Sequence, residues 1–389
     1  MPGRIHSNES HKIHPCKGMK KVCILTSVHP RYDTRIFIKQ AQSLVKAGYD
    51  VTLIVADGFG CEKKDGIHII DVGVSSIGRI SRMTRIALLM YKKALGINAH
   101  IYHFHDPELI TVGLLLKIQG KHVIYDVHED YPKAILSKYY LNPPMRKFTS
   151  SLFEVFERFG AKYFTGIVPA TPAIAKRFAS FNRNIIVVQN FPVHDDLIDM
   201  KISWKKRSDI VAYIGAISAL RGVKEMVNAI GLASEGINVT LALAGKFSSQ
   251  SLKKEVECLD GWRHIQYLGH LPQEKVTGLL CRVKAGLVVF HGEPNHIFSQ
   301  PNKLFEYMSA GIPVIASNFP LWRKIIDESN SGICIDPLSP REIAEAVRWI
   351  IEHPKESETM GQNGRKEIQE KYNWSMEEKK LLLFYESLL

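Results

Sequence analysis

The chain has 389 residues, of which 45% are hydrophobic and 23% charged, and its 51 lysine and arginine residues against 39 aspartate and glutamate residues give a net charge of +12. This ordinary globular composition excludes intrinsically disordered and fibrous classes, and the length suits two domains better than one. No run of about eighteen apolar residues occurs, so we predict no membrane-spanning helix. The positive charge favours an anionic ligand, which could be a phosphorylated small molecule, nucleic acid or an acidic lipid surface.

The first eighteen residues, 1–18, have no apolar core and lack the pattern of a secretory signal, so we expect a disordered tail there. The six cysteines form no C-x-x-C pair. This spacing favours reduced thiols and argues against a zinc site or a disulfide framework. Together these features predict a cytoplasmic protein, which could lie at the inner face of a membrane.

After the tail, apolar strands alternate with helices up to residue 188. Strands are expected at 21–27, 50–56, 67–72, 99–104, 122–127, 166–169 and 184–188, and helices at 36–47, 79–95, 145–162 and 172–181. This alternation is typical of parallel strands joined by helical crossovers. The turn after the first strand contains no G-x-G-x-x-G motif, which argues against a dinucleotide-dependent oxidoreductase.

Polar residues follow three of these strands. They are Asp33 and Arg35 after the first strand, His105 and Asp106 after the strand at 99–104, and His128 and Glu129 after the strand at 122–127. Because open α/β sheets bind ligands beyond the carboxyl ends of parallel strands, these side chains are candidate site residues. Plainer interpretations stay open: Asp33 and Asp106 could each cap the helix that follows, and His128 could cap a strand end.

Two basic surfaces could rest on anionic lipid. One is the face of the helix at 79–95 that carries Arg82, Arg85 and Lys92, and the other is the pair Arg146 and Lys147. Each charge near such a surface would contribute about 1 kcal/mol. A solvated helix face is the alternative for both.

The segment 190–208 is polar and broken by Pro192, which predicts a linker. A second alternation follows it. Strands are expected at 210–215, 238–245, 265–269, 286–290, 314–317 and 332–335, and the last helices at 355–372 and 376–388. Two such series predict an α/β protein with two Rossmann-like, doubly wound domains that face one another across a cleft.

The segment PNKLFEYMSAGIPVIASNFPLW, residues 301–322, is predicted to form a helix and then a short buried strand. Pro301 suits the first helical position, with Ser299 or Gln300 as the cap. Gly311 lies where a left-handed residue would end the helix.

The start of this helix is expected to face the cleft. Its free backbone N–H groups favour an anion, and Asn302 and Lys303 add donors beside them. Glu306 lies one turn deeper, on the same helix face as Lys303. This combination suits a ligand that has both phosphates and a sugar diol. The alternative is an exposed ion pair between Lys303 and Glu306, worth only about 0.3–0.5 kcal/mol.

The segment 301–322 resembles the nucleotide-binding segment of retaining family-four glycosyltransferases of the GT-B fold. YIGAISALRG at 213–222, LALAGKF, YLGHLP and NGRKEIQEKYNW resemble the same family and occur in the same order. The resemblance runs from Met19 to the C-terminus. It implies an acceptor-binding domain at 19–195, a nucleotide-sugar-binding domain at 196–372, and a C-terminal helix at 373–389 that crosses back to the first domain.

The resemblance also implies roles for individual residues. Glu306 matches the second of two family glutamates and would bind the ribose hydroxyls. The first glutamate falls on Phe298, so its contacts to the donor sugar could pass to Glu293 or Asn295.

The family's pair of diphosphate-binding cations falls on Ala216 and Arg221, so one cation is missing, and Lys303 could restore its charge. His128 matches the family's active-site histidine. The implied catalytic residues are therefore His128, Arg221 and Lys303, the implied donor-nucleotide residues are Asn190, Gly215, Gly245, Gly269, Asn302 and Glu306, and the acceptor-side candidates are Asp33, Arg35, His105, Asp106 and Glu129.

The resemblance implies a retaining hexosyltransferase. It would move a sugar from a UDP- or GDP-linked donor to a saccharide or lipid-linked acceptor in surface polysaccharide or glycolipid synthesis. No D-x-D motif follows a predicted strand, so neither a metal nor another cofactor is expected. Two alternatives stay open: a nucleotide-sugar 2-epimerase of the same fold, and a non-catalytic module that binds nucleotide sugar or nucleic acid. Nucleic acid is disfavoured, because no helix-turn-helix, RNA-recognition or zinc signature occurs.

Overall fold

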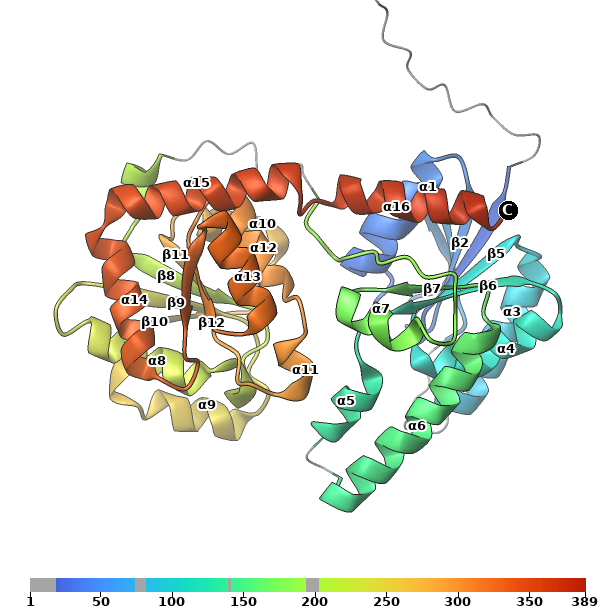
Figure 1. The fold of residues 1–389 in the computed structure, drawn as a ribbon, viewed down its shortest axis with the longest axis horizontal. Helices are drawn as coiled ribbons and strands as arrows, with labels where there is room; N and C mark the ends of the chain where they lie inside the picture. The colour runs from blue at the N-terminus through green and yellow to red at the C-terminus, as the bar shows by residue number, and fades with distance from the viewer. Residues whose placement is uncertain (1–18, 74–81, 139–140, 194–202) are drawn as a thin grey trace, which may run out of the picture.

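The computed structural model describes residues 19–73, 82–138, 141–193 and 203–389. Two parallel sheets form two lobes that lie side by side, and the last two helices run along the top of both lobes (Figure 1). The predicted tail at 1–18, the start of the predicted basic helix at 79–81 and the middle of the predicted linker at 194–202 lie outside the described residues.

Seven strands form the first sheet in the order β3-β4-β2-β1-β5-β6-β7. Their bounds are β1 (Lys21–Leu25), β2 (Asp50–Val55), β3 (Glu62–Lys64), β4 (Ile67–Asp71), β5 (Ile101–Phe104), β6 (His122–Val127) and β7 (Gly166–Pro169). Neighbouring strands pair in parallel, except that β3 and β4 form an antiparallel edge. The central strands β1, β5 and β6 are buried along nearly their whole length, which explains their continuous apolar sequences.

Two features of this sheet differ from the sequence expectations. The sequence of the edge strand β3, EKK, carries no apolar signal, so sequence analysis gives no strand there. The strand expected at 184–188 is wrong, because it is reduced to a single bridge between Ile167 and Ile185. At this point the chain leaves the edge of the sheet and crosses to the second domain.

The helices of the first domain are η1 (Thr34–Ala41), α1 (Gln42–Lys46), η2 (Arg82–Ile86), α3 (Ala87–Ile97), η3 (Pro107–Leu109), α4 (Ile110–Ile118), α5 (Tyr131–Leu136), α6 (Pro143–Tyr163) and α7 (Pro172–Phe178). The helix expected at 36–47 forms as the π-helix η1, whose turns are wider than those of an α-helix, followed by α1. Asp33 accepts hydrogen bonds from the backbone N–H groups of Arg35 and Ile36, which confirms the capping interpretation for Asp33.

Six strands form the second sheet in the order β10-β9-β8-β11-β12-β13, and all neighbours are parallel. Their bounds are β8 (Ile210–Ile214), β9 (Thr240–Ala244), β10 (Ile265–Gly269), β11 (Ala285–Val288), β12 (Val314–Ser317) and β13 (Gly332–Ile335).

The helices of the second half are η4 (Trp204–Lys206), η5 (Ala219–Arg221), α8 (Val223–Ala233), α9 (Gln250–Glu257), η6 (Asp260–His264), α10 (Gln273–Leu280), α11 (Pro294–Ile297), α12 (Asn302–Ser309), α13 (Pro320–Ser329), α14 (Pro340–Glu352), α15 (Pro354–Glu370) and α16 (Trp374–Ser387). None of the helices within the described ranges combines the length and the apolar composition needed to cross a bilayer.

Each sheet has a point where the order of its strands reverses. In the first sheet the chain builds outward from β1 through β2 and β4, and then returns to place β5 on the other side of β1. In the second sheet the same return places β11 beside β8. Loops that leave the two central strands diverge at such a point and leave a crevice for a ligand. The segments after β1 and β5, and those after β8 and β11, are therefore the expected ligand-binding segments.

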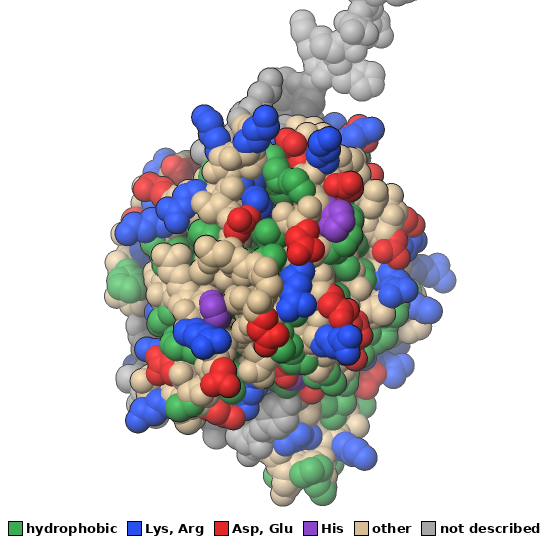
Figure 2. Space-filling view, turned by 90° about the vertical axis from the view of Figure 1, so that its left-hand side faces the viewer, with side chains coloured by type: hydrophobic (Ala, Val, Ile, Leu, Met, Phe, Trp, Pro, Cys, Tyr) green, Lys and Arg blue, Asp and Glu red, His purple; other side chains and the backbone are tan. Residues whose placement is uncertain are grey.

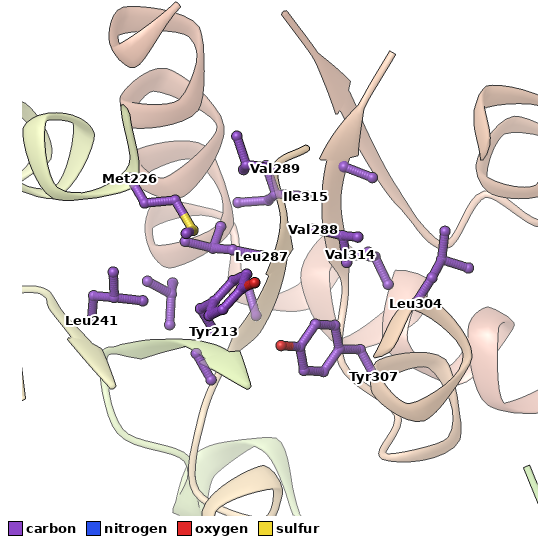
Figure 3. Packing of buried hydrophobic residues seen from close by; sticks show 14 of the residues in the cluster. Tyr213, Met226, Leu241, Leu287, Val288, Val289, Leu304, Tyr307, Val314 and Ile315 are labelled. Carbon is purple, nitrogen blue, oxygen red and sulfur yellow. The ribbon is translucent and has the colours of Figure 1, made fainter. Parts of the chain in front are cut away.

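The core of the second domain includes β8, β11 and α12. Figure 3 shows Tyr213 of β8 and Tyr307 of α12 pointing into this core near Leu287 of β11. The hydroxyl oxygen of Tyr307 accepts a hydrogen bond of 3.0 Å from the backbone N–H of Ile214, which ties the end of β8 to α12. Gly286 of β11 leaves room for the Tyr307 ring, because a Cβ atom at this position would lie 2.1 Å from that ring.

The two segments that cross between the domains lie side by side, because the backbone N–H of Trp374 donates to the carbonyl oxygen of Pro192 over 2.8 Å. Beyond this point α16 lies on the first domain, where Trp374, Leu381 and Tyr385 join the core around β1 and β2. The indole N–H of Trp374 donates to the Ser43 hydroxyl over 2.9 Å. This arrangement confirms the predicted fold class of two Rossmann-like domains with a C-terminal helix that crosses back.

Replacing Gly286 with alanine should destabilise the protein by about 1–3 kcal/mol, because the new methyl group would press on the Tyr307 ring. Urea-induced unfolding measures this change. Gly278 of α10 is the matched control: no described atom lies within 4 Å of a Cβ atom added there, and alanine favours a helix, so Gly278→Ala should leave stability unchanged or raise it. Equal stability of the two variants would contradict the packing described for Tyr307.

Candidate active site

A cleft of about 630 Å³ lies between the two domains, within the size range of small-molecule sites. Both domains contribute to it through segments that follow strand ends. The predicted residues that line it are Asp33, Arg35, His128, Glu129, Asn190, Gly215, Arg221, Asn302, Lys303 and Glu306. The structure therefore brings most of the predicted site together in one place.

The helix α12 begins one residue later than expected. Pro301 has extended backbone angles and is the residue before the helix, so Asn302 is the first helical residue. Among the described residues no side chain caps this end, and neither Ser299 nor Gln300 does so. Gln300 instead accepts a hydrogen bond from the Gln189 amide over 2.5 Å. The N–H groups at the start of α12 are thus left to face the cleft, where they favour an anion.

Lys303 is only 8% exposed, so the interpretation as an exposed ion pair with Glu306 is wrong. Within the described ranges no atom forms a hydrogen bond with its Nζ atom. This atom lies 3.8 Å from the centre of the Tyr213 ring and 5.2 Å from that of Phe290. Burial, and then the nearby charge of Arg221, hold the pKa of Lys303 well below its usual value. An anion bound beside this amine would favour its charged form, so Lys303 is suited to an anionic partner.

Arg221 lies at the end of η5 and lines the same cleft as Lys303. Its guanidinium carbon is 5.3 Å from the centre of the Phe290 ring, and its Nη1 atom donates to the carbonyl oxygen of Ala216 over 3.3 Å. Two cations and a helix N-terminus therefore converge on one part of the cleft. Together they can neutralise a diphosphate.

Gly215 lets the end of β8 approach Lys303 closely. It has a positive φ of 131°, and a Cβ atom there would lie 3.0 Å from the Nζ atom of Lys303. Gly245 lies directly behind, because a Cβ atom on it would lie 1.8 Å from the Gly215 oxygen. Its N–H donates to the Gly269 carbonyl over 2.7 Å. Gly245 and Gly269 are not among the cleft residues, and their contacts support the position of Gly215.

Glu306 is partly buried, and burial raises the pKa of its carboxyl group. The charge of Lys39, from η1 of the other domain, acts on it. Lys39 is itself buried, and burial lowers its pKa to about 7. Its Nζ atom donates to the side-chain oxygen of Asn190 over 2.7 Å, and the Asn190 amide donates to Asn302 over 3.3 Å. This chain of contacts joins the two domains at the cleft.

Sequence analysis does not single out Lys39, although a signal for it exists. The buried positions of η1 include Ile36, Phe37 and Ala41, and Lys39 and Gln40 interrupt this apolar face. A charged residue and an amide on a buried helix face require polar partners elsewhere in the fold. Gln40 finds its partner in a second cluster, described next.

Asp126, at the end of β6, is fully buried and central to a polar cluster. It accepts a hydrogen bond of 2.6 Å from the Gln40 amide and pairs with Arg35 through an Nη2–Oδ1 distance of 3.0 Å. Its Oδ1 atom also lies 3.3 Å from Nε2 of His128. Burial alone would raise the pKa of Asp126, but Arg35 and then His128 hold it well below its usual value. Asp126 is therefore an anion that fixes its neighbours.

Three histidines surround this anion. Nδ1 of His105 lies 3.0 Å from Nε2 of His128, and Nδ1 of His103 lies 2.6 Å from the Tyr385 hydroxyl of α16. Burial lowers the pKa of His105 well below its usual value and that of His128 to about 3, so both rings are neutral. We assign the proton of His128 to Nε2, which faces the ionised Asp126. His128 thus reaches the cleft as a neutral, firmly oriented imidazole.

Ligand atoms of His103, His105 and Asp126 lie within 4.8 Å of one another, a spacing that could hold a metal ion. The chemistry of the cluster opposes this, because the Arg35 guanidinium is already bonded to Asp126 and would repel a second cation. We therefore regard the cluster as a set of hydrogen bonds that positions His128.

Three of the acceptor-side candidates are held by contacts within the first domain. Arg35 lines the cleft, and its guanidinium is bound by Asp126 and by the Val188 carbonyl over 2.8 Å. His105 and Asp106 are buried and are not among the cleft residues.

The capping interpretation for Asp106 is also wrong. Its carboxylate makes no capping bond to η3, within the described residues, and instead accepts hydrogen bonds from Ser27 N–H over 2.5 Å and from the Thr26 hydroxyl over 2.9 Å. Asp106, which follows β5, therefore holds the loop that follows the neighbouring strand β1. This is the point where the strand order of the first sheet reverses.

Comparisons with known proteins agree with this geometry. Residues 34–192 match the family model Glycosyltransferase Family 4, and residues 195–367 match the model Glycosyl transferases group 1. The chain is 23% identical over 368 residues to an uncharacterised glycosyltransferase of Methanocaldococcus jannaschii, which covers 86% of this chain and 88% of that protein. It is also 23% identical over 268 residues to the D-rhamnosyltransferase WbpZ of Pseudomonas aeruginosa, which covers 67% of this chain and 66% of that protein.

Two solved structures share the fold. Sucrose-phosphate synthase from Thermosynechococcus elongatus superposes with a TM-score of 0.74 at 16% identity, over 95% of this chain and 99% of that one. HepE of Anabaena, in complex with UDP and glucose, superposes with a TM-score of 0.71 at 13% identity, over 95% of this chain and 100% of that one.

Replacing Asp126 with asparagine should destabilise the protein by about 3–5 kcal/mol, because Arg35 would stay buried without its counter-charge. Denaturant-induced unfolding measures the loss. Glu345→Gln, which breaks the exposed ion pair with Arg341, is the matched control and should cost about 0.5 kcal/mol or less.

The pKa of Asp126 also sets the pH dependence of this loss, because it is lower in the folded protein than in the unfolded chain. The contribution of ionised Asp126 to the free energy of unfolding is complete above about pH 4. It is lost as the pH falls through the lowered pKa of Asp126 in the folded protein. The gap in stability between wild type and Asp126→Asn should therefore stay constant near neutral pH and narrow in acid. A gap that widens in acid would contradict an ionised Asp126.

Proposed function

The chain belongs to the family 4 glycosyltransferases, and on this premise we propose that it transfers a sugar, with retention of configuration, from a UDP- or GDP-linked donor to a saccharide or lipid-linked acceptor. As a member of this family it is an enzyme that uses nucleotide sugars. The product would be a surface polysaccharide or a glycolipid. The proposal rests mainly on Lys303 at the start of α12. Its amino group is buried, and none of the described residues forms a hydrogen bond with it.

The donor diphosphate would lie between Lys303, Arg221 and the start of α12. A buried cation without a partner costs several kcal/mol, and a bound diphosphate would remove that cost. During transfer, negative charge grows on the leaving phosphate, and fixed donors aimed at that charge lower the barrier by about 3–4 kcal/mol each. Because the chain supplies two cations at this place, we propose that transfer does not require a metal ion.

The donor nucleoside would extend from the diphosphate along α12. Glu306 would accept hydrogen bonds from the ribose hydroxyls, while Asn302 and Asn190 hold the start of the helix near the crossover. The base would lie near Gln273 and Val276, which line the same cleft. That HepE binds UDP and glucose in a similar fold supports a uridine donor, with guanosine as the alternative.

The donor sugar would lie toward the loop that contains α11. Phe298, where the family has its first glutamate, lines the cleft and is 50% exposed. Asn295 also lines the cleft, whereas Glu293 is not among the cleft residues. We therefore assign the missing contacts to the sugar hydroxyls to Asn295.

The acceptor would enter from the first domain, where His128, Glu129 and Asp33 line the cleft. The neutral ring of His128 is held through Nε2, so its remaining nitrogen can accept a hydrogen bond from a substrate hydroxyl. We propose that the leaving phosphate takes the proton of the attacking hydroxyl on the same face of the sugar. The family assignment favours transfer over the two alternatives, a 2-epimerase and a non-catalytic binding module.

The proposal is tested by incubating the protein with UDP- and GDP-linked sugars and following the release of free nucleoside diphosphate, with and without lipid-linked or saccharide acceptors. We expect release that increases with an acceptor and persists in the presence of a chelator. Epimerisation of the donor without transfer, binding without turnover, or activity that disappears with chelator and returns with magnesium would each contradict the proposal.

Replacing Lys303 with alanine should lower the turnover number at least tenfold, about 1.4 kcal/mol, because the leaving phosphate would lose a fixed cation. Steady-state release of nucleoside diphosphate measures it. Lys324→Ala, at a side chain that is 69% exposed, is the matched control and should leave turnover unchanged. A wild-type rate for Lys303→Ala would show that Lys303 does not support the leaving group.

Replacing Glu306 with glutamine should weaken UDP binding about tenfold, because a charge-assisted hydrogen bond to the ribose diol would be lost. Titration calorimetry measures the affinity. The control is a ligand rather than a variant: UDP that lacks both ribose hydroxyls should bind wild type and Glu306→Gln equally. A variant that loses the same affinity for both ligands would contradict the ribose role.

A further inference from the structure

Helix α6 presents a stripe of large apolar side chains to solvent. Seven residues expose between 37% and 67% of their surface, and each lies three or four positions from another of them: Met145, Phe148, Leu152, Val155, Phe156, Phe159 and Tyr163. This spacing places them on one face of the helix over all of its six turns or so. Proteins that stay free in water rarely expose a contiguous apolar surface of this size, so the stripe indicates a binding surface.

The orientation of the stripe is fixed by the opposite face of α6. Glu157 is buried and accepts a hydrogen bond of 2.9 Å from the Tyr125 hydroxyl, and its other oxygen lies 2.6 Å from Nη1 of Arg177. The Ser150 hydroxyl donates to the Pro132 carbonyl over 2.8 Å. These contacts hold the buried face against the first domain, so the apolar stripe must point outward.

A row of positive charge runs beside the stripe. Lys147, Arg158 and Lys162 are exposed on α6, whereas Glu157 is buried and Glu154 is only partly exposed. The exposed part of α6, all of which the structure describes, is therefore mainly apolar and basic, and Glu154 is the one carboxylate that partly reaches its surface. An apolar stripe flanked by basic residues is the pattern of helices that lie in the plane of a membrane surface.

We propose that α6 docks on an anionic lipid bilayer, with its apolar stripe in the boundary between headgroups and acyl chains. This inference rests on the proposed function and deepens it, because it selects a lipid-linked acceptor. A second copy of the chain fits less well: two stripes packed face to face would bring the basic rows of both copies together. Lipid phosphates instead complement each row.

Helix α5 connects α6 to the acceptor side of the cleft. It packs against both α6 and α11, so it lies between α6 and the second domain (Figure 1). Lys133 of α5 lines the cleft, and its Nζ atom lies 4.9 Å from the centre of the Phe298 ring. An acceptor with its lipid in the bilayer beside α6 would therefore present its headgroup to the cleft past α5.

The shape of the molecule suits this placement. The lower end of α6 projects below the rest of the protein in Figure 1. In Figure 2, which is turned about the vertical axis, hydrophobic side chains lie at the lowest point, with lysine or arginine side chains just above them. This end can reach a flat surface without obstruction from the second domain.

The experiment is co-sedimentation of the full chain with vesicles of phosphatidylcholine alone, or with about one-third phosphatidylglycerol. The test variant combines Phe148→Glu and Phe159→Glu. The matched control combines Ile118→Glu and Leu338→Glu, two apolar side chains elsewhere on the surface that are at least as exposed. Each variant adds two charges, so a general effect of charge would appear in both. Thermal unfolding checks that both variants fold.

We expect wild type and the control to bind the anionic vesicles, more weakly at high salt, and the stripe variant to bind at least tenfold less. All three should release nucleoside diphosphate from the donor equally in the absence of lipid. Equal vesicle binding by all three proteins overturns the docking proposal, as does a wild-type dimer that the stripe variant dissociates. A wild type that docks on vesicles but neither binds nor turns over any donor would instead overturn the proposed function.

Discussion

The buried ammonium group of Lys303 is the constraint around which the second domain is arranged. Gly215 must lack a side chain so that the end of β8 can come close to it, and Gly245 must lack one so that Gly215 can take its position. The Tyr213 ring lies beneath it, and the Tyr307 hydroxyl ties the same strand end to α12. The charged form of this amine is costly in such a setting until an anion binds, which is why we propose that a diphosphate binds at the start of α12.

The first domain contributes to the cleft through a buried cluster of polar side chains around Asp126. Asp126 is a buried, ionised carboxylate. It pairs with Arg35, accepts a hydrogen bond from Gln40 and lies close to Nε2 of His128. Tyr385 reaches the same cluster through His103, so the C-terminal helix contributes to the position of a cleft residue although it belongs to the far end of the chain. The crossing helix therefore does more than connect the domains, because its contact with His103 helps to hold the cluster that positions His128 in the cleft.

Elements whose signals are local are predictable from the sequence. The strands at 122–127, 166–169, 265–269, 314–317 and 332–335 occur with the predicted bounds, because each is a short apolar run between turn residues. The convergence of Arg221, Lys303 and Glu306 on the cleft followed from their positions after strand ends and from the family resemblance. Contacts between residues far apart in the sequence are not predictable in this way. Lys39 meets Asn190, 151 residues away, and His103 meets Tyr385, 282 residues away, and no local pattern encodes such contacts.

A structure of the protein with UDP or GDP bound would examine the role of Lys303 most directly. The account predicts the diphosphate oxygens within about 3 Å of the Lys303 Nζ atom and of the first N–H groups of α12, with Arg221 turned toward them and no metal ion between. A diphosphate bound elsewhere in the cleft, with Lys303 still unpartnered, would contradict it.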